Sequence, residues 1–266
     1  MAAKKRSFAP FGRDFNSAFP LWHKISLLTV GCWMVGAAEA APDGIPAEKK
    51  SADPAKPALK KAAVSSIAAS DLAEFEELPT AVQSLIRAAL ALTQRQLTYR
   101  FGSADPDLGG MDCSGTIYYL LRSQKRTEVP RQSNHIGQWV IDHSTWHGAP
   151  ADGQWSEAGL EALQPGDLLF WSGTYEHAPR ELPISHVMLY LGRHRETGKR
   201  LMFGASDGRR YNGEARCGVS VFDFTLPRPE SKARFFGYGR IPGIAQKSIP
   251  PIEVRKAEPA TPKTAS

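Results

Sequence analysis

The sequence predicts an α+β fold in which helices come first and strands follow. Between residues 80 and 95, apolar side chains recur every three to four positions, which is the spacing of one buried helix face. After residue 165, the apolar segments become short and are bounded by Gly, Pro or Asp, as is typical of strands. Helices followed by strands favour helices packed on an antiparallel sheet over alternating βαβ units.

The helical half is expected to begin with a short helix that Ser70 or Asp71 caps and that ends at Glu77. A longer helix then starts at Thr80 and ends near Arg95. After a loop over 102–110, a third helix is expected over 114–124, with its apolar residues on one face. About five strands are predicted, over 166–171, 186–191, 200–205, 218–224 and 233–240.

Composition divides the 266 residues into four segments. Residues 1–40 read as a signal peptide and 71–243 as one compact domain. Residues 41–70 are rich in Ala, Pro and Lys, and 244–266 have a similar composition. Such segments carry too few large apolar side chains to form a core, so both are predicted to be disordered.

The signal peptide prediction depends on three features of the first 40 residues. A basic region ends at Lys24, an apolar run of about 14 residues follows, and Ala38-Glu39-Ala40 forms a cleavage site. The apolar run is too short to span a bilayer comfortably, so we expect no integral span after cleavage. Export to the periplasm or the surface of a bacterium is the favoured interpretation. An uncleaved anchor, or a lipoprotein attached through Cys32, is the alternative.

The formal charge of +6 does not indicate a nucleic-acid partner, because the excess lies in the flanks. Residues 1–40, 41–70 and 241–266 carry net charges of +3, +2 and +2, which leaves −1 for residues 71–240. A nearly neutral folded part lacks the basic surface that nucleic-acid binding requires.

The main candidate for chemistry is Cys113, in Asp112-Cys113-Ser114-Gly115. It lies at the predicted start of a helix, where free backbone N–H groups and the positive end of the helix dipole should favour the thiolate. His186 lies at the start of a strand, where its imidazole could act as the base. A disulfide between Cys113 and Cys217 is the structural alternative.

Five motifs follow one another along the chain: Tyr99-Arg100-Phe101-Gly102, Asp112-Cys113-Ser114-Gly115, Val129-Pro130-Arg131-Gln132-Ser133, 163–170, and Ser185-His186-Val187 with the residues up to Gly192. Motifs in this order resemble those of the NlpC/P60 family of cell-wall cysteine peptidases. Together they cover most of residues 97–225. The resemblance implies a papain-like fold, with the nucleophile at a helix N-terminus and the base on the facing sheet.

The resemblance also implies hydrolysis of peptidoglycan stem peptides, usually between D-γ-glutamate and the diamino acid. Cys113 would be the nucleophile and His186 the base. Tyr99, Asp112 and Ser114 would contact the substrate, although Asp112 could equally be a helix N-cap. Arg131 is expected to be structural.

The sequence departs from the family at the residue that orients the base. The His that the family usually supplies falls on Gly204, which has no side chain. Ser206 lies on the same strand face and is a possible orienter, and Asp207, a backbone carbonyl or a water are the others.

Two further functions remain open: an amidase or acyltransferase of the same Cys/His superfamily, and a wall-binding module whose catalysis has decayed. No cofactor is expected, because the thiol supplies the nucleophile. No metal is expected either, since no Cys or further His completes a site around His143 and His147. The protein is expected to be a monomer.

Overall fold

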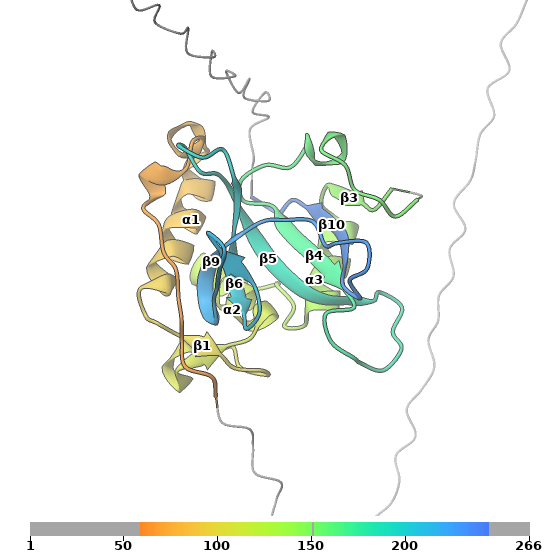
Figure 1. The fold of residues 1–266 in the computed structure, drawn as a ribbon, viewed down its shortest axis with the longest axis horizontal. Helices are drawn as coiled ribbons and strands as arrows, with labels where there is room; N and C mark the ends of the chain where they lie inside the picture. The colour runs from red at the N-terminus through yellow and green to blue at the C-terminus, as the bar shows by residue number, and fades with distance from the viewer. Residues whose placement is uncertain (1–58, 151, 245–266) are drawn as a thin grey trace, which may run out of the picture. The chain divides into compact units, whose positions relative to one another are not determined.

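The computed structural model describes residues 59–150 and 152–244. The predicted signal peptide and most of the predicted linker and tail lie outside these residues. The described part is an α+β structure with three α-helices and a six-stranded antiparallel sheet (Figure 1). The helices are α1 (Thr80–Thr93), α2 (Cys113–Ser123) and α3 (Ser133–His143).

The strands of the main sheet are arranged in the order β3-β10-β4-β5-β6-β9. Their bounds are β3 (Trp146–Gly148), β4 (Leu168–Ser172), β5 (Ile184–Arg193), β6 (Arg200–Ser206), β9 (Gly218–Asp223) and β10 (Arg234–Gly239). Two small sheets accompany it. One pairs β1 (Thr98–Tyr99) with β2 (Gly110–Met111), and the other pairs β7 (Arg210–Tyr211) with β8 (Glu214–Ala215).

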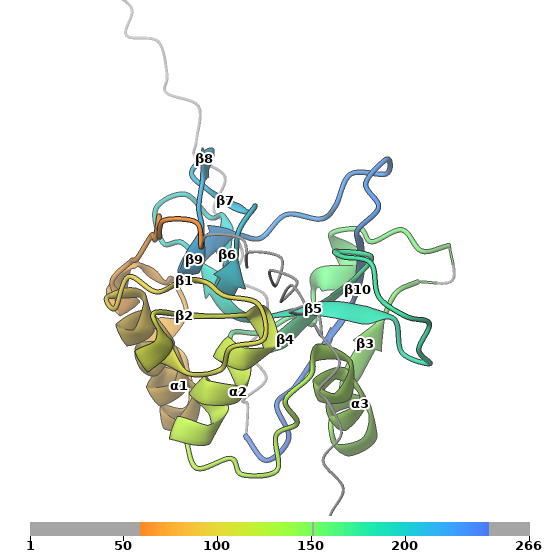
Figure 2. The same ribbon diagram turned by 90° about the horizontal axis from the view of Figure 1, so that it is seen from below.

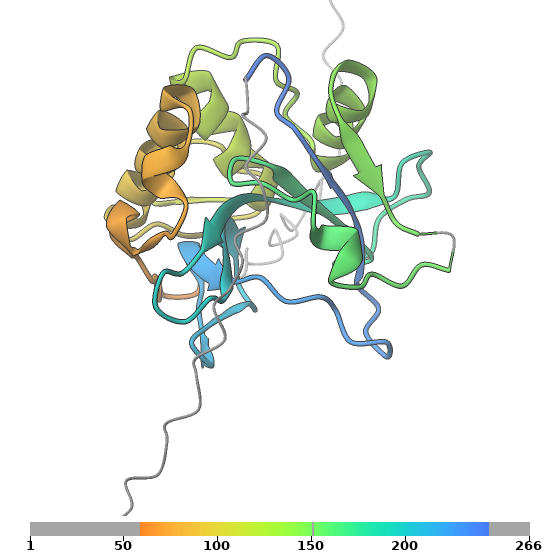
Figure 3. The ribbon, with the colours of Figure 1, turned by 90° about the horizontal axis from the view of Figure 1, so that it is seen from above.

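Both faces of the sheet are covered, one of them by all three helices (Figure 2). On the other face, Leu160, Leu163, Phe224 and Leu226 pack against side chains of the sheet. The segment from β9 to β10, which includes Phe224 and Leu226, runs across the molecule between these two strands (Figure 3). Because both faces are buried, β5 is buried over nine consecutive residues and has no polar side, although its neighbours are antiparallel.

The pairing of β5 with β6 stops before either strand ends. Leu189 is paired with Phe203, but from Gly204 to Ser206 the pairing of β6 is with β9. The start of β5, including His186 and Val187, therefore has β4 as its neighbour on one side only. Helix α2 contacts both β5 and β6, and its N-terminus lies at this end of the sheet.

All five predicted strands are present, and the long predicted helix corresponds to α1. The predicted short helix is replaced by two 3-10 turns, Ala69–Asp71 and Phe75–Glu77. The expected number of strands was wrong by one, because β3 lies where a loop was expected and pairs with β10. Helix α3 was also missed. It has an apolar stripe of Ile136, Trp139 and Val140, but Gln132 gives its start no side-chain cap.

The last part of the predicted linker lies against the edge strand β9. The backbone of Ala63 exchanges hydrogen bonds with Cys217, and the N–H of Ser65 donates to the Ser220 hydroxyl at 2.8 Å. An edge strand has unpaired backbone N–H and C=O groups. A segment of small residues can supply backbone hydrogen-bond partners for them without contributing large side chains. Within residues 59–150 and 152–244, no helix combines the length and apolar character needed to cross a membrane.

Candidate active site

The N-terminus of α2 is fixed by Asp112 and Gly115. The Asp112 carboxylate accepts a hydrogen bond from the Gly115 N–H at 2.5 Å, so Asp112 is the N-cap of α2. Gly115 is required by a close approach of the backbone, since a Cβ there would lie 2.1 Å from the Ser103 carbonyl oxygen. The loop before α2 therefore packs directly on its first turn and holds Cys113 as the first residue of the helix.

A hydrogen-bond network closes around the carboxylate of Asp112. Arg131 donates to both of its oxygens, at 3.1 and 2.8 Å, and the Gly102 N–H donates at 2.9 Å. Arg131 also donates to the Ser114 hydroxyl at 2.9 Å, and that hydroxyl donates to Asp112 at 3.3 Å. The expected structural role of Arg131 agrees with these contacts. Asp112 and Ser114, two of the predicted substrate contacts, are buried, and the network uses the carboxylate of the first and the hydroxyl of the second.

The Cys113 side chain is 6% exposed and lies close to the start of β5. The pKa of its thiol is raised to about 11, first by burial and then by the negative charge of Asp112. The backbone N–H groups of Val187 and Ser114 and the charge of Arg131 oppose this shift and lower the pKa. The expectation that the helix start favours the thiolate was wrong for this state, because desolvation outweighs the helix N-terminus.

His186 is also buried, on the strand that faces Cys113. Burial lowers its pKa well below the ordinary value, and the positive charge of Arg209 lowers it further. Its Nε2 atom has no hydrogen-bond partner among the described residues. The ring lies 5.7 Å from that of Trp171, its partner on β4.

Cys113 lies close to His186 because its sulfur contacts the backbone of β5 next to that residue. The N–H that acts on the Cys113 sulfur belongs to Val187, the residue after His186. No hydrogen bond joins the thiol and the imidazole among the described residues. The pKa of the Cys113 thiol is raised and the pKa of the His186 imidazole is lowered, so both groups are neutral near pH 7. The pair is therefore a thiol beside an imidazole and not a thiolate–imidazolium ion pair.

Gly204, at the position where the family usually has the residue that orients the base, contributes no side chain, and the structure shows why a larger residue would not fit. A Cβ on Gly204 would lie 3.1 Å from Cγ of Met188, so the Met188 side chain fills the space over Gly204. Ser206 lines the same pocket as His186, but its hydroxyl accepts a hydrogen bond from the Gly208 N–H at 3.4 Å and makes none to His186. Asp207 forms an ion pair with Lys60 at 3.0 Å.

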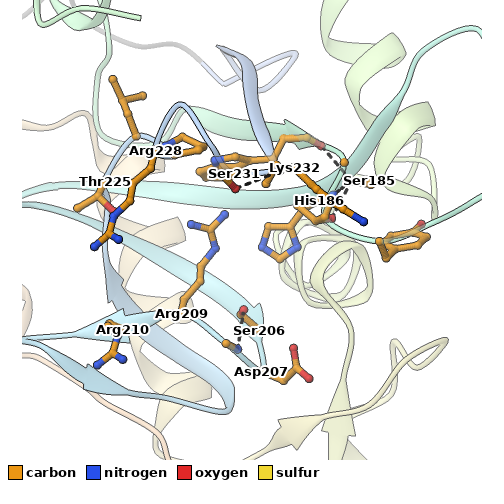
Figure 4. A pocket seen from close by; sticks show the side chains of 18 of the residues that line it. Ser185, His186, Ser206, Asp207, Arg209, Arg210, Thr225, Arg228, Ser231 and Lys232 are labelled. Carbon is orange, nitrogen blue, oxygen red and sulfur yellow. Dashed lines mark hydrogen bonds between the residues drawn. The ribbon is translucent and has the colours of Figure 1, made fainter.

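A pocket of about 1230 Å³ opens beside His186. Figure 4 shows His186, Arg209 and Ser206 around it. Tyr99, a predicted substrate contact, also lines it, and Cys113 is not among the lining residues. Burial and the nearby Cys113 and Asp112 raise the pKa of Tyr99, so its hydroxyl stays protonated. The volume suits a ligand of peptide size.

Sequence reasoning missed three residues of this pocket. Arg209 places its guanidinium carbon 4.1 Å from the centre of a Trp171 ring. Phe101 and Tyr175 meet edge to face at 5.9 Å and are 70% and 40% exposed. Phe101 belongs to one of the quoted motifs, and its exposure could not be read from the sequence. Nothing in the sequence distinguishes Arg209 from Arg210.

The remaining cysteine and histidines form neither a disulfide nor a metal site within the described residues. Cys113 and Cys217 are both free, and the Cys217 sulfur lies 3.8 Å from the Thr98 hydroxyl, so the alternative of a disulfide does not hold. No group of three or more His, Cys, Asp or Glu that could hold a metal occurs within the described ranges. His135 lies in α3 and is exposed.

The comparisons with known proteins agree with the motifs. A family model described as "NlpC/P60 family" matches residues 96–212, a range that contains Tyr99, the start of α2, β5 and Arg209. No curated protein and no solved structure matches the chain.

Proposed function

Because residues 96–212 form an NlpC/P60 family domain, and that family acts on the bacterial cell wall as hydrolases, we propose that this protein is an exported cysteine endopeptidase of peptidoglycan stem peptides. The bond cleaved is the one between D-γ-glutamate and the diamino acid. The observation that carries the proposal is the position of Cys113 at the start of α2, against the N–H of Val187 and beside His186.

The proposed reaction uses the thiol of Cys113 and the imidazole of His186. As the sulfur attacks the scissile carbonyl carbon, the thiol proton passes to the imidazole. The resulting imidazolium protonates the leaving amine, and an acyl-thioester remains on Cys113. His186 then takes a proton from water, which attacks the thioester and releases the acid and the free thiol.

The first residues of α2 supply the electrostatic part of this mechanism. Backbone N–H groups at the start of a helix have no intrahelical partner, so the N–H of Cys113 is available to the oxyanion. The neutral thiol and imidazole of the free protein mean that the proton moves during attack on the bound substrate. His186 is thus a general base, rather than half of a permanent ion pair.

The arrangement of helix start and facing strand supports a papain-like fold, with the nucleophile on α2 and the base on β5. The proposed location is the periplasm or the cell surface, on the strength of the basic and apolar N-terminal segment and its Ala38-Glu39-Ala40 sequence.

The test is hydrolysis of a defined tripeptide, L-Ala–γ-D-Glu–diaminopimelate, by the purified protein. Mass spectrometry should detect release of the L-Ala–D-Glu dipeptide by the wild type and none by Cys113→Ala. Whole sacculi separate this activity from that of an amidase, which would free glycan from intact peptides. Lack of turnover by the wild type, or equal turnover by both proteins, would reject the proposal.

One observation favours a second candidate, a wall-binding module with decayed catalysis. Gly204 and Met188 leave His186 without a side chain to orient it, and Nε2 has no partner. Such a module would bind sacculi with the same affinity before and after Cys113→Ala and would hydrolyse neither the tripeptide nor the sacculi.

A further inference from the structure

Arg209 is a cation without an anion. Its side chain makes no hydrogen bond or ion pair with any residue of the described part of the chain, and the residue is largely buried. Desolvation lowers its pKa to about 10, and no acidic side chain compensates for it. A partly desolvated guanidinium with no partner is unfavourable, so its position needs another explanation.

No acidic group of the same pocket forms an ion pair with Arg209 within the described residues. Asp207 pairs with Lys60. Asp223 accepts a hydrogen bond from the Asn212 N–H at 2.9 Å through Oδ2, and its Oδ1 is buried without a partner among the described residues. Glu230 lines the pocket from the segment between β9 and β10 and forms no ion pair with Arg209. Arg209 thus remains available to an anion that enters the pocket from outside.

Trp171 fixes the guanidinium in a geometry that leaves its hydrogen-bond donors free. The guanidinium carbon lies over a ring of Trp171, 4.1 Å from its centre, which is a cation–π contact. The five N–H donors of the guanidinium make no hydrogen bond to another described residue, so they remain free for a ligand. A planar group held in this way is prepared for a bidentate contact with a carboxylate.

The guanidinium also lies beside the candidate catalytic pair. In Figure 4 the side chain of Arg209 extends into the pocket toward His186, whereas that of Arg210 points away. The charge of Arg209 acts on the pKa of His186, and Cys113 acts on the pKa of Arg209. Two buried nitrogen atoms nearby, Nε1 of Trp171 and Nε2 of His186, also lack a hydrogen-bond partner among the described residues.

We propose that Arg209 binds a carboxylate of the substrate peptide, close to the bond that Cys113 attacks. Arg209 would thus select an anionic substrate, and the identity of the peptide rests on the proposed function. A carboxylate there would also cancel the positive field on His186. The imidazole would then accept the thiol proton more readily once a correct substrate is bound.

The test compares L-Ala–γ-D-Glu–diaminopimelate with the same peptide in which the free carboxylates are primary amides. Calorimetric titration of the Cys113→Ala protein measures binding without turnover. We expect the carboxylate peptide to bind about 10–100-fold more tightly, the range for hydrogen bonds to a charged group. Arg209→Gln in the same background should abolish this preference, and Arg209→Lys should retain part of it, because the charge stays and the fork is lost.

Arg210→Gln is the matched control, because this neighbouring arginine donates to the Gly213 carbonyl and points away from His186. It should retain the full preference. Circular dichroism melting of each variant checks that the fold is intact, and Arg209→Lys keeps the test valid if Arg209→Gln does not fold. Equal binding of the two peptides, binding of neither, or an unchanged preference in both Arg209 variants would overturn the inference. If the preference depends on Arg209 but no bond is hydrolysed by the wild type, the proposed function fails and the carboxylate site stands.

Discussion

The two sides of the site differ in how completely their polar groups are satisfied. On the α2 side, the carboxylate of Asp112 accepts from Arg131, from the Ser114 hydroxyl and from two backbone N–H groups. On the β5 side, His186 has a buried nitrogen without a partner and Arg209 is unpaired. Networks that are fully paired stabilise a fold, whereas groups left unpaired mark the place where a ligand completes the structure. The contrast assigns stability to the first side and binding and chemistry to the second.

The largest effect is expected on the β5 side, from His186→Ala. Loss of the base should lower hydrolysis of the tripeptide by about 10⁴-fold or more. The free energy of unfolding should change by less than about 1 kcal/mol, because the variant also removes a buried nitrogen without a partner. Single-turnover assays and urea unfolding measure the two quantities. A variant that is strongly destabilised but retains activity would reverse the contrast.

The next largest effect is expected on the α2 side, from Asp112→Ala. The substitution removes the N-cap of α2 and leaves Arg131 without its partner, which should lower the free energy of unfolding by roughly 3 kcal/mol. Asp107→Asn is the matched control, since its ion pair with Arg95 is exposed and should contribute less than about 1 kcal/mol. Urea unfolding that gives similar losses for the two variants would show that the network does not stabilise the fold.

The third prediction concerns the protonation state of the thiol. Alkylation of Cys113 by iodoacetamide should accelerate with rising pH and approach a plateau only near the pKa of about 11, because burial disfavours the thiolate. The measurement uses a protein with Cys32→Ser and Cys217→Ser, so that a single thiol reacts. A plateau between pH 5 and 7 would mean that Cys113 and His186 form an ion pair in the free protein.

The smallest effect is expected at the position that lacks an orienting side chain. Gly204→His should cost about 1–3 kcal/mol by overpacking, since its Cβ would meet Met188. Met188→Ala should remove part of this cost, and a double-mutant cycle measured by urea unfolding gives the coupling, expected to be about 1 kcal/mol or more. Additive effects would show that Met188 does not fill the missing position.

The elements with the clearest periodic pattern were predictable from the sequence. The stripe of α1 and the apolar runs of β4, β5, β6, β9 and β10 gave the α+β class and most of the strands. The strand β3 is only three residues long and pairs through its backbone, so side-chain patterns do not reveal it. The start of α3 has no side-chain cap, which removed the usual signal for that helix.

The site was predictable at the residues that motifs name and not at those that burial decides. Cys113 and His186 were placed from local sequence, but the directions of their pKa shifts depend on how deeply the chain buries them. Arg209 could not be separated from Arg210 in the sequence, because the cation–π contact of Arg209 with Trp171 and the hydrogen bond of Arg210 to the Gly213 carbonyl arise only in the folded chain. The filling of the Gly204 position by Met188 likewise depends on the pairing of β5 with β6.

The most direct test of the account is a search for the acyl-thioester. The protein is mixed with L-Ala–γ-D-Glu–diaminopimelate, quenched in acid within one turnover, digested and analysed by mass spectrometry. The account predicts that the peptide carrying Cys113 gains the mass of the dipeptidyl acyl group, and that His186→Ala gains it far more slowly. Release of the dipeptide with no label on Cys113, or with the label on another residue, would contradict it.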